Sequence, residues 1–173
     1  EKGMSLSSQN SNEDYFSSTK CGKKVTDLTY LTSKLCLLTG NAGQGKTNFL
    51  CDFTENVLLK RHIPFAYVNG YEVDATDVEN IFIKTICPSL DISFSKMMDE
   101  VAKYCYAIRK PIVFIIDGLN ENPYPERFAV SLEKFLKRFM AFDFVKIIMT
   151  CRSEYFDENF SDLLNAFSDD MII

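Results

Sequence analysis

One run of the sequence has residue types and a spacing suited to binding phosphate: Gly40-Asn41-Ala42-Gly43-Gln44-Gly45-Lys46-Thr47. It fits the pattern G-x-x-x-x-G-K-S/T, follows an apolar run and opens a helical pattern, which is the context that this motif requires. Glycines let the backbone curl so that successive N–H groups point at one phosphate, and the helix N-terminus adds its dipole. Lys46 has the reach to contact β- and γ-phosphates, and the Thr47 hydroxyl is suited to Mg²⁺. Residues Gly40 to Asn48 therefore form the candidate nucleotide-binding loop.

A second candidate is the carboxylate that ends the apolar run Ile112-Val113-Phe114-Ile115-Ile116-Asp117. Such a run predicts a buried strand that places Asp117 at its carboxyl end, beside the loop of the first strand. There Asp117 could hold the water shell of Mg²⁺. An aspartate in an ordinary turn gives the same local pattern. The position about 70 residues after the phosphate loop favours the metal interpretation.

The stretch after Asp117 supplies a candidate general base. Glu121 stands four positions further on, in Gly118-Leu119-Asn120-Glu121. A base must reach the water that attacks the γ-phosphate, and Glu121 is the nearby carboxylate that the metal would leave free. A solvated loop glutamate is the alternative. The following Asn122-Pro123-Tyr124-Pro125 predicts a rigid loop on the same rim.

A third apolar run, Lys146-Ile147-Ile148-Met149-Thr150-Cys151-Arg152, predicts a strand with Thr150 and Arg152 at its carboxyl end. Arg152 could donate hydrogen bonds to the γ-phosphate and report whether that phosphate is present. The alternative is a surface arginine paired with Glu154 or Asp157.

Alternating apolar runs and helical periodicity predict the elements that must position these residues. We expect strands at 35–39, 65–69, 112–116, 145–149 and 171–173. We expect a helix at 46–61, with Phe49, Leu50, Phe53 and Val57 on one face. A second helix is expected to start at a capping box, Thr76–Glu79, and to end at Pro88. Further helices are expected at 95–109, 126–142 and 161–167. This order predicts a mainly parallel sheet with helices on both faces, a three-layer α/β/α fold. Ligands of such sheets bind beyond the carboxyl ends of the strands.

Composition narrows the class of protein. The 173 residues are 46% apolar, which suits a globular domain. The net charge of −5 disfavours nucleic-acid binding, which needs a basic surface. The longest aliphatic or aromatic run is far too short to span a membrane. The single histidine, His62, sits in an expected helix end, which disfavours a histidine-dependent hydrolase. None of the six cysteines has CxxC spacing, so we expect no zinc site and reduced thiols in a cytoplasmic protein.

The polar residues 1–24 are expected to form a linker or flexible arm, and residues 25–173 the nucleotide-binding domain. The chain begins with Glu1, and it could be a piece of a longer protein.

Together, GNAGQGKT, IVFIIDGLNE and KIIMTCR resemble the nucleotide-binding core of STAND-class P-loop NTPases, in the NACHT branch. The specific mark is Gly118 directly after Asp117, and the strand end Thr150-Cys151-Arg152 resembles the sensor 1 of that family. The run TCRSEYF is similar to strand ends of bacterial antiviral, NLR-like STAND proteins. Asn120 departs from the pattern, which has Asp there, and this leaves Glu121 as the candidate hydrolytic carboxylate.

The resemblance implies an ASCE or AAA+-related P-loop fold and a switch between ADP and ATP with Mg²⁺. It also implies slow ATP hydrolysis, self-oligomerisation in the full-length protein, and a protein trigger and effector domain outside this chain. We expect no direct nucleic-acid or membrane partner for this domain. The isolated chain is expected to be a monomer with little or no ATPase activity.

Three other functions fit parts of the pattern. A nucleoside- or nucleotide-type phosphotransferase would need several arginines around the phosphates. An AAA+ remodelling ATPase would share the phosphate loop but normally has adjacent Asp and Glu where Gly118 intervenes here. A binding-only scaffold would hold nucleotide without turnover.

Overall fold

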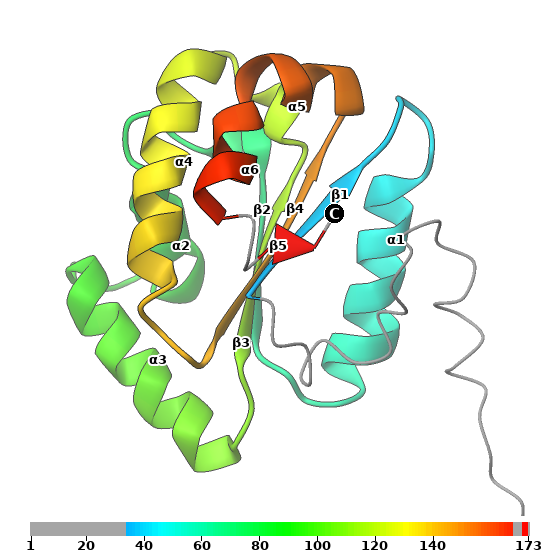
Figure 1. Cartoon of the computed structure of the whole chain (residues 1–173). Helices are drawn as coiled ribbons and strands as arrows, with labels where there is room; N and C mark the ends of the chain where they lie inside the picture. The colour runs from blue at the N-terminus through cyan, green and yellow to red at the C-terminus, as the bar shows by residue number, and fades with distance from the viewer. Residues whose placement is uncertain (1–33, 168–170, 173) are drawn as a thin grey trace, which may run out of the picture. The chain divides into compact units, whose positions relative to one another are not determined.

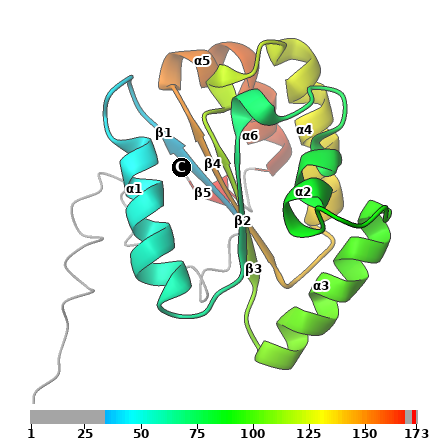
Figure 2. The ribbon, with the colours of Figure 1, turned by 180° about the vertical axis from the view of Figure 1, so that it is seen from behind.

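The computed structural model describes residues 34–167 and 171–172. The expected polar arm at 1–24 and the expected domain start at residue 25 lie outside the described residues, as does residue 173 of the expected fifth strand. Figures 1 and 2 show the described part from opposite sides.

A parallel sheet forms the centre of the fold, with the strand order β2-β3-β4-β1-β5. The strands are β1 (Leu35–Thr39), β2 (Phe65–Asn69), β3 (Ile112–Asp117), β4 (Val145–Cys151) and β5 (Met171–Ile172). The predicted parallel sheet is confirmed. The strand β4 lies between β1 and β3, so the strand that ends in Asp117 does not pair with the strand that leads into the phosphate loop. The carboxyl ends of β1, β4 and β3 therefore form one continuous edge.

Helices cover both faces of this sheet, as predicted. On one face lies α1 (Lys46–Phe53), which continues into the π-helical segment η2 (Thr54–Leu59). On the other face lie α2 (Val78–Ile86), α3 (Phe94–Ile108) and α4 (Pro125–Phe139) (Figures 1 and 2). The short helices α5 (Ser153–Asn159) and α6 (Ser161–Phe167) follow β4, and their Phe156 and Phe167 join the hydrophobic core that contains Phe82 and Phe114. No helix in the described ranges is both long and apolar enough to cross a membrane.

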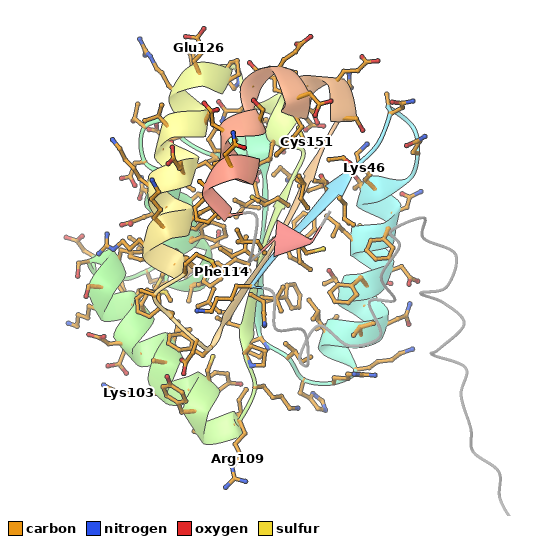
Figure 3. All side chains as sticks on the ribbon, viewed as in Figure 1. Lys46, Lys103, Arg109, Phe114, Glu126 and Cys151 are labelled. Carbon is orange, nitrogen blue, oxygen red and sulfur yellow. The ribbon has the colours of Figure 1, made fainter. Side chains whose placement is uncertain are left out.

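Aromatic rings fill the layer between β3 and the helices on the second face. Phe114, in the middle of β3, meets Phe82 and Phe139 edge to face, with ring centroids 4.8 Å apart in both pairs. Phe82 also stacks on Phe135 at 5.3 Å. All four rings are buried, and each contributes about 1.5–3 kcal/mol relative to an exposed ring. Figure 3 places Phe114 in the middle of the sheet and Lys46 and Cys151 toward one end of it. This packing fixes β3, and with it the position of Asp117.

The first helix differs from its predicted pattern. We expected Phe49, Leu50, Phe53 and Val57 on one face, but the fully buried residues are Leu50, Phe53 and Leu58, while Phe49 and Val57 are half-buried. A π-helical turn is wider than an α-turn by one residue, and this shifts burial from Val57 to Leu58.

The predicted capping box at Thr76–Glu79 is wrong. Asp77 is the N-cap of α2, and its carboxylate accepts from the Asn80 N–H at 3.2 Å. Thr76 instead donates its N–H and hydroxyl to the Asp74 carboxylate, at 2.8 and 2.7 Å. Because Thr76 is hydrogen-bonded to Asp74 in this way, the next residue, Asp77, takes the N-cap position. Glu79 forms an ion pair with Arg138 of α4, at 2.7 Å.

Candidate nucleotide-binding site

A pocket of about 300 Å³ lies where β1, β3 and β4 end, and it collects the polar residues that the sequence singled out. It is lined by Ala42, Gly43, Gln44, Gly45, Lys46, Thr47, Asn48, Asp117, Gly118, Asn120, Glu121, Thr150 and Arg152. Of the predicted site residues, only Gly40 and Asn41 are absent from this lining, and both touch Lys46 through their carbonyl oxygens.

The loop before α1 is shaped to present backbone N–H groups. Gly43 and Gly45 have φ of 76° and 80°, in the left-handed region that favours glycine. Gly45 is the N-cap of α1, and no side chain caps this helix. The first turn of α1 also carries no acidic residue. An uncapped, positively polarised helix start is suited to an anion such as phosphate.

Two side chains of the loop are bonded to the loop itself. The Lys46 ammonium donates to the carbonyl oxygens of Gly40 at 2.7 Å and Asn41 at 3.0 Å. The Gln44 side-chain oxygen accepts from the Asn41 N–H at 2.8 Å. These bonds hold the curled loop together and keep the Lys46 ammonium at the rim of the pocket. A lysine so placed needs only a side-chain rotation to meet a phosphate oxygen.

The Asp117 carboxylate is held from both sides by hydroxyl groups. Thr150 of β4 donates to one of its oxygens at 2.5 Å, and Tyr67 of β2 donates to the other at 2.7 Å. The Thr150 hydroxyl also accepts from the Gly118 N–H at 2.7 Å. Asp117 is only 6% exposed, so these bonds replace much of its hydration. Neither contact is predicted by the sequence, in which Thr150 figures only in the sensor 1 resemblance, since both contacts join residues distant in the chain.

Tyr67 remains a hydrogen-bond donor at all ordinary pH values. Burial raises its pKa well above the usual range, and the hydrogen bond to Asp117 raises this pKa further. Its neutral phenol is therefore fixed as the donor and the Asp117 carboxylate as the acceptor.

The turn after β3 arranges Glu121, Asn120 and Arg152 around the pocket. Gly118 has φ of 75° and starts the short 3₁₀ helix η4 (Leu119–Glu121). The Glu121 side chain folds back over Gly118, where an added Cβ would lie 2.9 Å from its carboxyl carbon. The Asn120 side-chain oxygen accepts from the Arg152 N–H at 3.1 Å. Asn120, where the resembled pattern has Asp, therefore joins the end of β4 to this turn.

Arg152 and Glu121 are both exposed at the rim of the pocket. Within residues 34–167 and 171–172, neither forms an ion pair. In particular, Arg152 does not pair with Glu154 or Asp157, the alternative that the sequence left open. Both side chains remain available to a ligand in the pocket.

The residues present fit a magnesium ion that binds together with phosphate. Mg²⁺ keeps several waters and is usually held by one or two protein oxygens plus substrate phosphates. Thr47 and Asp117 line the same pocket. Each Asp117 oxygen accepts one hydrogen bond from the protein, and a carboxylate oxygen accepts two, so each retains capacity for a water.

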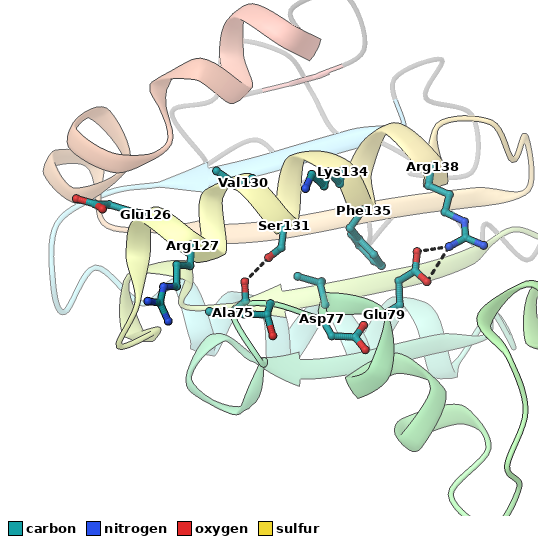
Figure 4. Close-up of a pocket in the computed structure, with 12 residues that line it drawn as sticks. Ala75, Asp77, Glu79, Glu126, Arg127, Val130, Ser131, Lys134, Phe135 and Arg138 are labelled. Atoms are coloured by element: carbon teal, nitrogen blue, oxygen red, sulfur yellow. Dashed lines mark hydrogen bonds and ion pairs between the residues drawn. The ribbon is translucent and has the colours of Figure 1, made fainter.

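A larger cavity, of about 610 Å³, lies between α2 and α4 and contains none of the predicted site residues. Figure 4 shows it, with the Ser131 hydroxyl bonded to the Ala75 carbonyl and Arg138 paired with Glu79. It has no glycine loop and no strand end, so we place the candidate site at the smaller pocket.

No family model matches the chain, and no curated protein matches it. Two solved structures have a similar fold. Cdc6p from Pyrobaculum aerophilum superposes with a TM-score of 0.53 and 12% identity, over 80% of this chain and 38% of that chain. The ORC2 protein of Aeropyrum pernix, in ADPNP–ADP complexes, gives 0.52 and 16%, over 77% of this chain and 40% of that chain.

The chain therefore spans about two fifths of the length of both proteins. At such low identity the likeness concerns the fold alone. The likeness extends over most of this chain and concerns its mixed α/β fold with a parallel sheet. By its structure, this chain has the fold of the P-loop NTPases.

Proposed function

We propose that this domain binds ATP and ADP at the pocket beyond β1, β4 and β3 and slowly hydrolyses ATP. One observation supports this proposal above all. The loop with Lys46 and Thr47, the buried Asp117 and the exposed Glu121 line one pocket, although they come from distant parts of the chain. Each has the chemistry that its place requires.

The residues of the chain divide the work as follows. The backbone N–H groups of the loop and Lys46 bind the β- and γ-phosphates and offset their charge. Thr47 and Asp117 would hold Mg²⁺ and its waters, and the metal supplies further charge stabilisation when it is bound. Glu121 accepts a proton from the attacking water as the oxygen–phosphorus bond forms and the bond to ADP breaks. Arg152 donates to the γ-phosphate.

We further propose that this chemistry serves a STAND-type switch, in which the bound nucleotide controls oligomerisation and an attached effector of a defence protein. Support comes from the resemblance carried by Gly118 after Asp117 and by the Thr150-Cys151-Arg152 strand end. In the described structure these two marks are in contact, because the Gly118 N–H donates to Thr150. Asn120 then joins this turn to Arg152. A change at the γ-phosphate could thus reach both β3 and β4.

One alternative gains support and another loses it. The fold likeness to Cdc6p and the ORC2 protein favours an AAA+ remodelling ATPase as the second candidate. A phosphotransferase is disfavoured because it would need several arginines around the phosphates, and only one of the five arginines lines the pocket. Arg152 lines the pocket, whereas Arg127 and Arg138 line the other cavity, and Arg61 and Arg109 lie at neither.

The experiment that separates these functions is a product assay with γ-labelled ATP, with and without AMP as an acceptor. A slow hydrolase releases labelled phosphate at the same rate in both mixtures. A phosphotransferase moves the label to AMP. Bound but unchanged ATP after many hours would identify a binding-only scaffold and contradict the hydrolytic part of the proposal.

A further inference from the structure

The Asp117 carboxylate has a second protein donor that the proposed function does not use. Tyr67 is on β2, the strand on the opposite side of β3 from β4. The phenol donates to one Asp117 oxygen at 2.7 Å, while Thr150 donates to the other. The carboxylate is thus clamped between hydroxyl groups from its two neighbouring strands.

The position of Tyr67 in the sheet explains how it reaches this carboxylate. In the parallel register Tyr67 pairs with Ile115, and Asn69 pairs with Asp117. Side chains two apart on a strand share a face, so Ile115 and Asp117 point to the same side of the sheet. The phenol ring therefore leans along the strand by two residues to place its hydroxyl at Asp117.

Tyr67 stands behind Asp117 and does not line the pocket itself. It is half-buried, and its electrostatic neighbours besides Asp117 are Cys51 of α1 and Glu121. Thr47 is on the first turn of the same helix α1. The hydroxyl of Tyr67 thus fixes Asp117 from the side of α1, without a place for direct contact with a nucleotide.

We propose that Tyr67 is a positioning residue for the magnesium site: its hydroxyl fixes the orientation in which Asp117 accepts hydrogen bonds from waters on Mg²⁺. This inference rests on the proposed function. The terminal torsion of an aspartate is broad and has little rotational preference of its own, so a second donor is needed to fix the carboxylate plane. Tyr67 uses one acceptor position of its oxygen and leaves another for water.

The test is the magnesium dependence of ATP affinity, measured by equilibrium dialysis of the whole chain in EDTA and over a series of Mg²⁺ concentrations. Tyr67→Phe keeps the ring and removes only the hydroxyl. Partners behind a metal ligand typically change metal affinity by about 10- to 100-fold. We expect the Mg²⁺ concentration for half-maximal tightening to rise by about 10-fold, with ATP affinity in EDTA unchanged. Tyr71→Phe is the matched control, since Tyr71 is exposed in the turn after β2 and its hydroxyl donates to Glu72.

A double-mutant cycle shows whether Tyr67 acts through Asp117. Asp117→Asn alone should weaken the magnesium dependence, and Tyr67→Phe should add nothing in that background. Additive effects overturn the proposal. So does a Tyr67→Phe chain with unchanged magnesium dependence, with tighter Mg²⁺ binding, or with weaker ATP binding in EDTA. A wild-type chain that binds no ATP overturns the proposed function, and this inference with it.

Discussion

The Thr150 hydroxyl joins β4 to β3 by donating to the Asp117 carboxylate at 2.5 Å. The same oxygen accepts from the Gly118 N–H, so one side chain satisfies both groups at the end of β3. Thr150 is 1% exposed, and no water can replace it without a rearrangement of the sheet edge. Asp117 therefore depends on its neighbouring strand for its position as well as on its own.

Thr150→Val should destabilise the fold by about 1–3 kcal/mol, because it leaves a buried carboxylate oxygen and a backbone N–H without a partner. Valine has nearly the shape of threonine, so the packing of β4 is retained. Urea denaturation checks the free energy of unfolding. The exposed Thr39→Val at the end of β1 is the control and should change little. Equal stability of the two variants would show that the Thr150 bridge contributes nothing.

Gly70→Ala should disturb the turn that carries Glu121. An added Cβ at Gly70 would lie 2.1 Å from the Gly118 carbonyl oxygen, and this contact is with backbone, which cannot rotate away. We expect a loss of about 1–3 kcal/mol in the free energy of unfolding, typical of overpacking in a close contact.

A second variant, Asn122→Ser, tests the same contact between the two turns. The buried Asn122 amide donates to the carbonyl oxygens of Gly70 and Val73, at 3.0 and 2.9 Å, and ties the same two turns together. Both variants should melt at lower temperatures than wild type. A Gly70→Ala chain as stable as wild type would mean that the two turns are not packed as closely as described.

Cys51 and Cys151 should differ sharply in reactivity. Burial raises the pKa of the Cys151 thiol to about 12, and its side chain is fully buried, whereas Cys51 is exposed on α1. A thiol with that pKa has a thiolate fraction on the order of 10⁻⁴ at pH 8, and the thiolate is the reactive form. Alkylation of the native chain at pH 8, followed by peptide mass spectrometry, should label Cys51 within minutes and Cys151 only after denaturation. Equal labelling rates in the native chain would contradict the burial of β4.

Glu121→Gln should reduce single-turnover hydrolysis by at least about 100-fold, the range of a positioned general base. ATP affinity should stay within about threefold of wild type, because a base acts in the transition state and not in binding. Glu126→Gln is the matched control, since Glu126 is also exposed but lines the other cavity. Unchanged turnover in Glu121→Gln would assign the base to another residue.

Local sequence patterns were sufficient for the sheet and for most of the pocket. The glycine loop and the apolar runs ending at Asp117 and near Arg152 are short-range signals, and all of them meet at one edge. The clamp on Asp117 could not be predicted in this way. Tyr67 and Thr150 reach Asp117 only because β2 and β4 flank β3, and strand order is a property of the whole chain.

The misplaced details have local physical causes. Asp74 competes for Thr76 and moves the cap of α2 to Asp77. The π-helical turn after α1 shifts burial to Leu58, which no periodic pattern of 3.6 residues would find. The helix α5 (Ser153–Asn159), directly after Arg152, has no predicted counterpart because Phe156 is its one buried residue, so it carries no apolar periodicity.

The most direct test of the whole account is the affinity of the chain for ATP, measured by titration calorimetry with Lys46→Ala beside wild type. Lys46 is the only lysine of the candidate loop, and its ammonium stands at the rim of the pocket. Lys60→Ala, at the far end of the same helical segment, is the control. We predict that Lys46→Ala weakens ATP binding by 10-fold or more, which corresponds to about 1.4 kcal/mol for each factor of ten, and that Lys60→Ala does not. Equal ATP affinities for wild type and Lys46→Ala would contradict nucleotide binding at this loop.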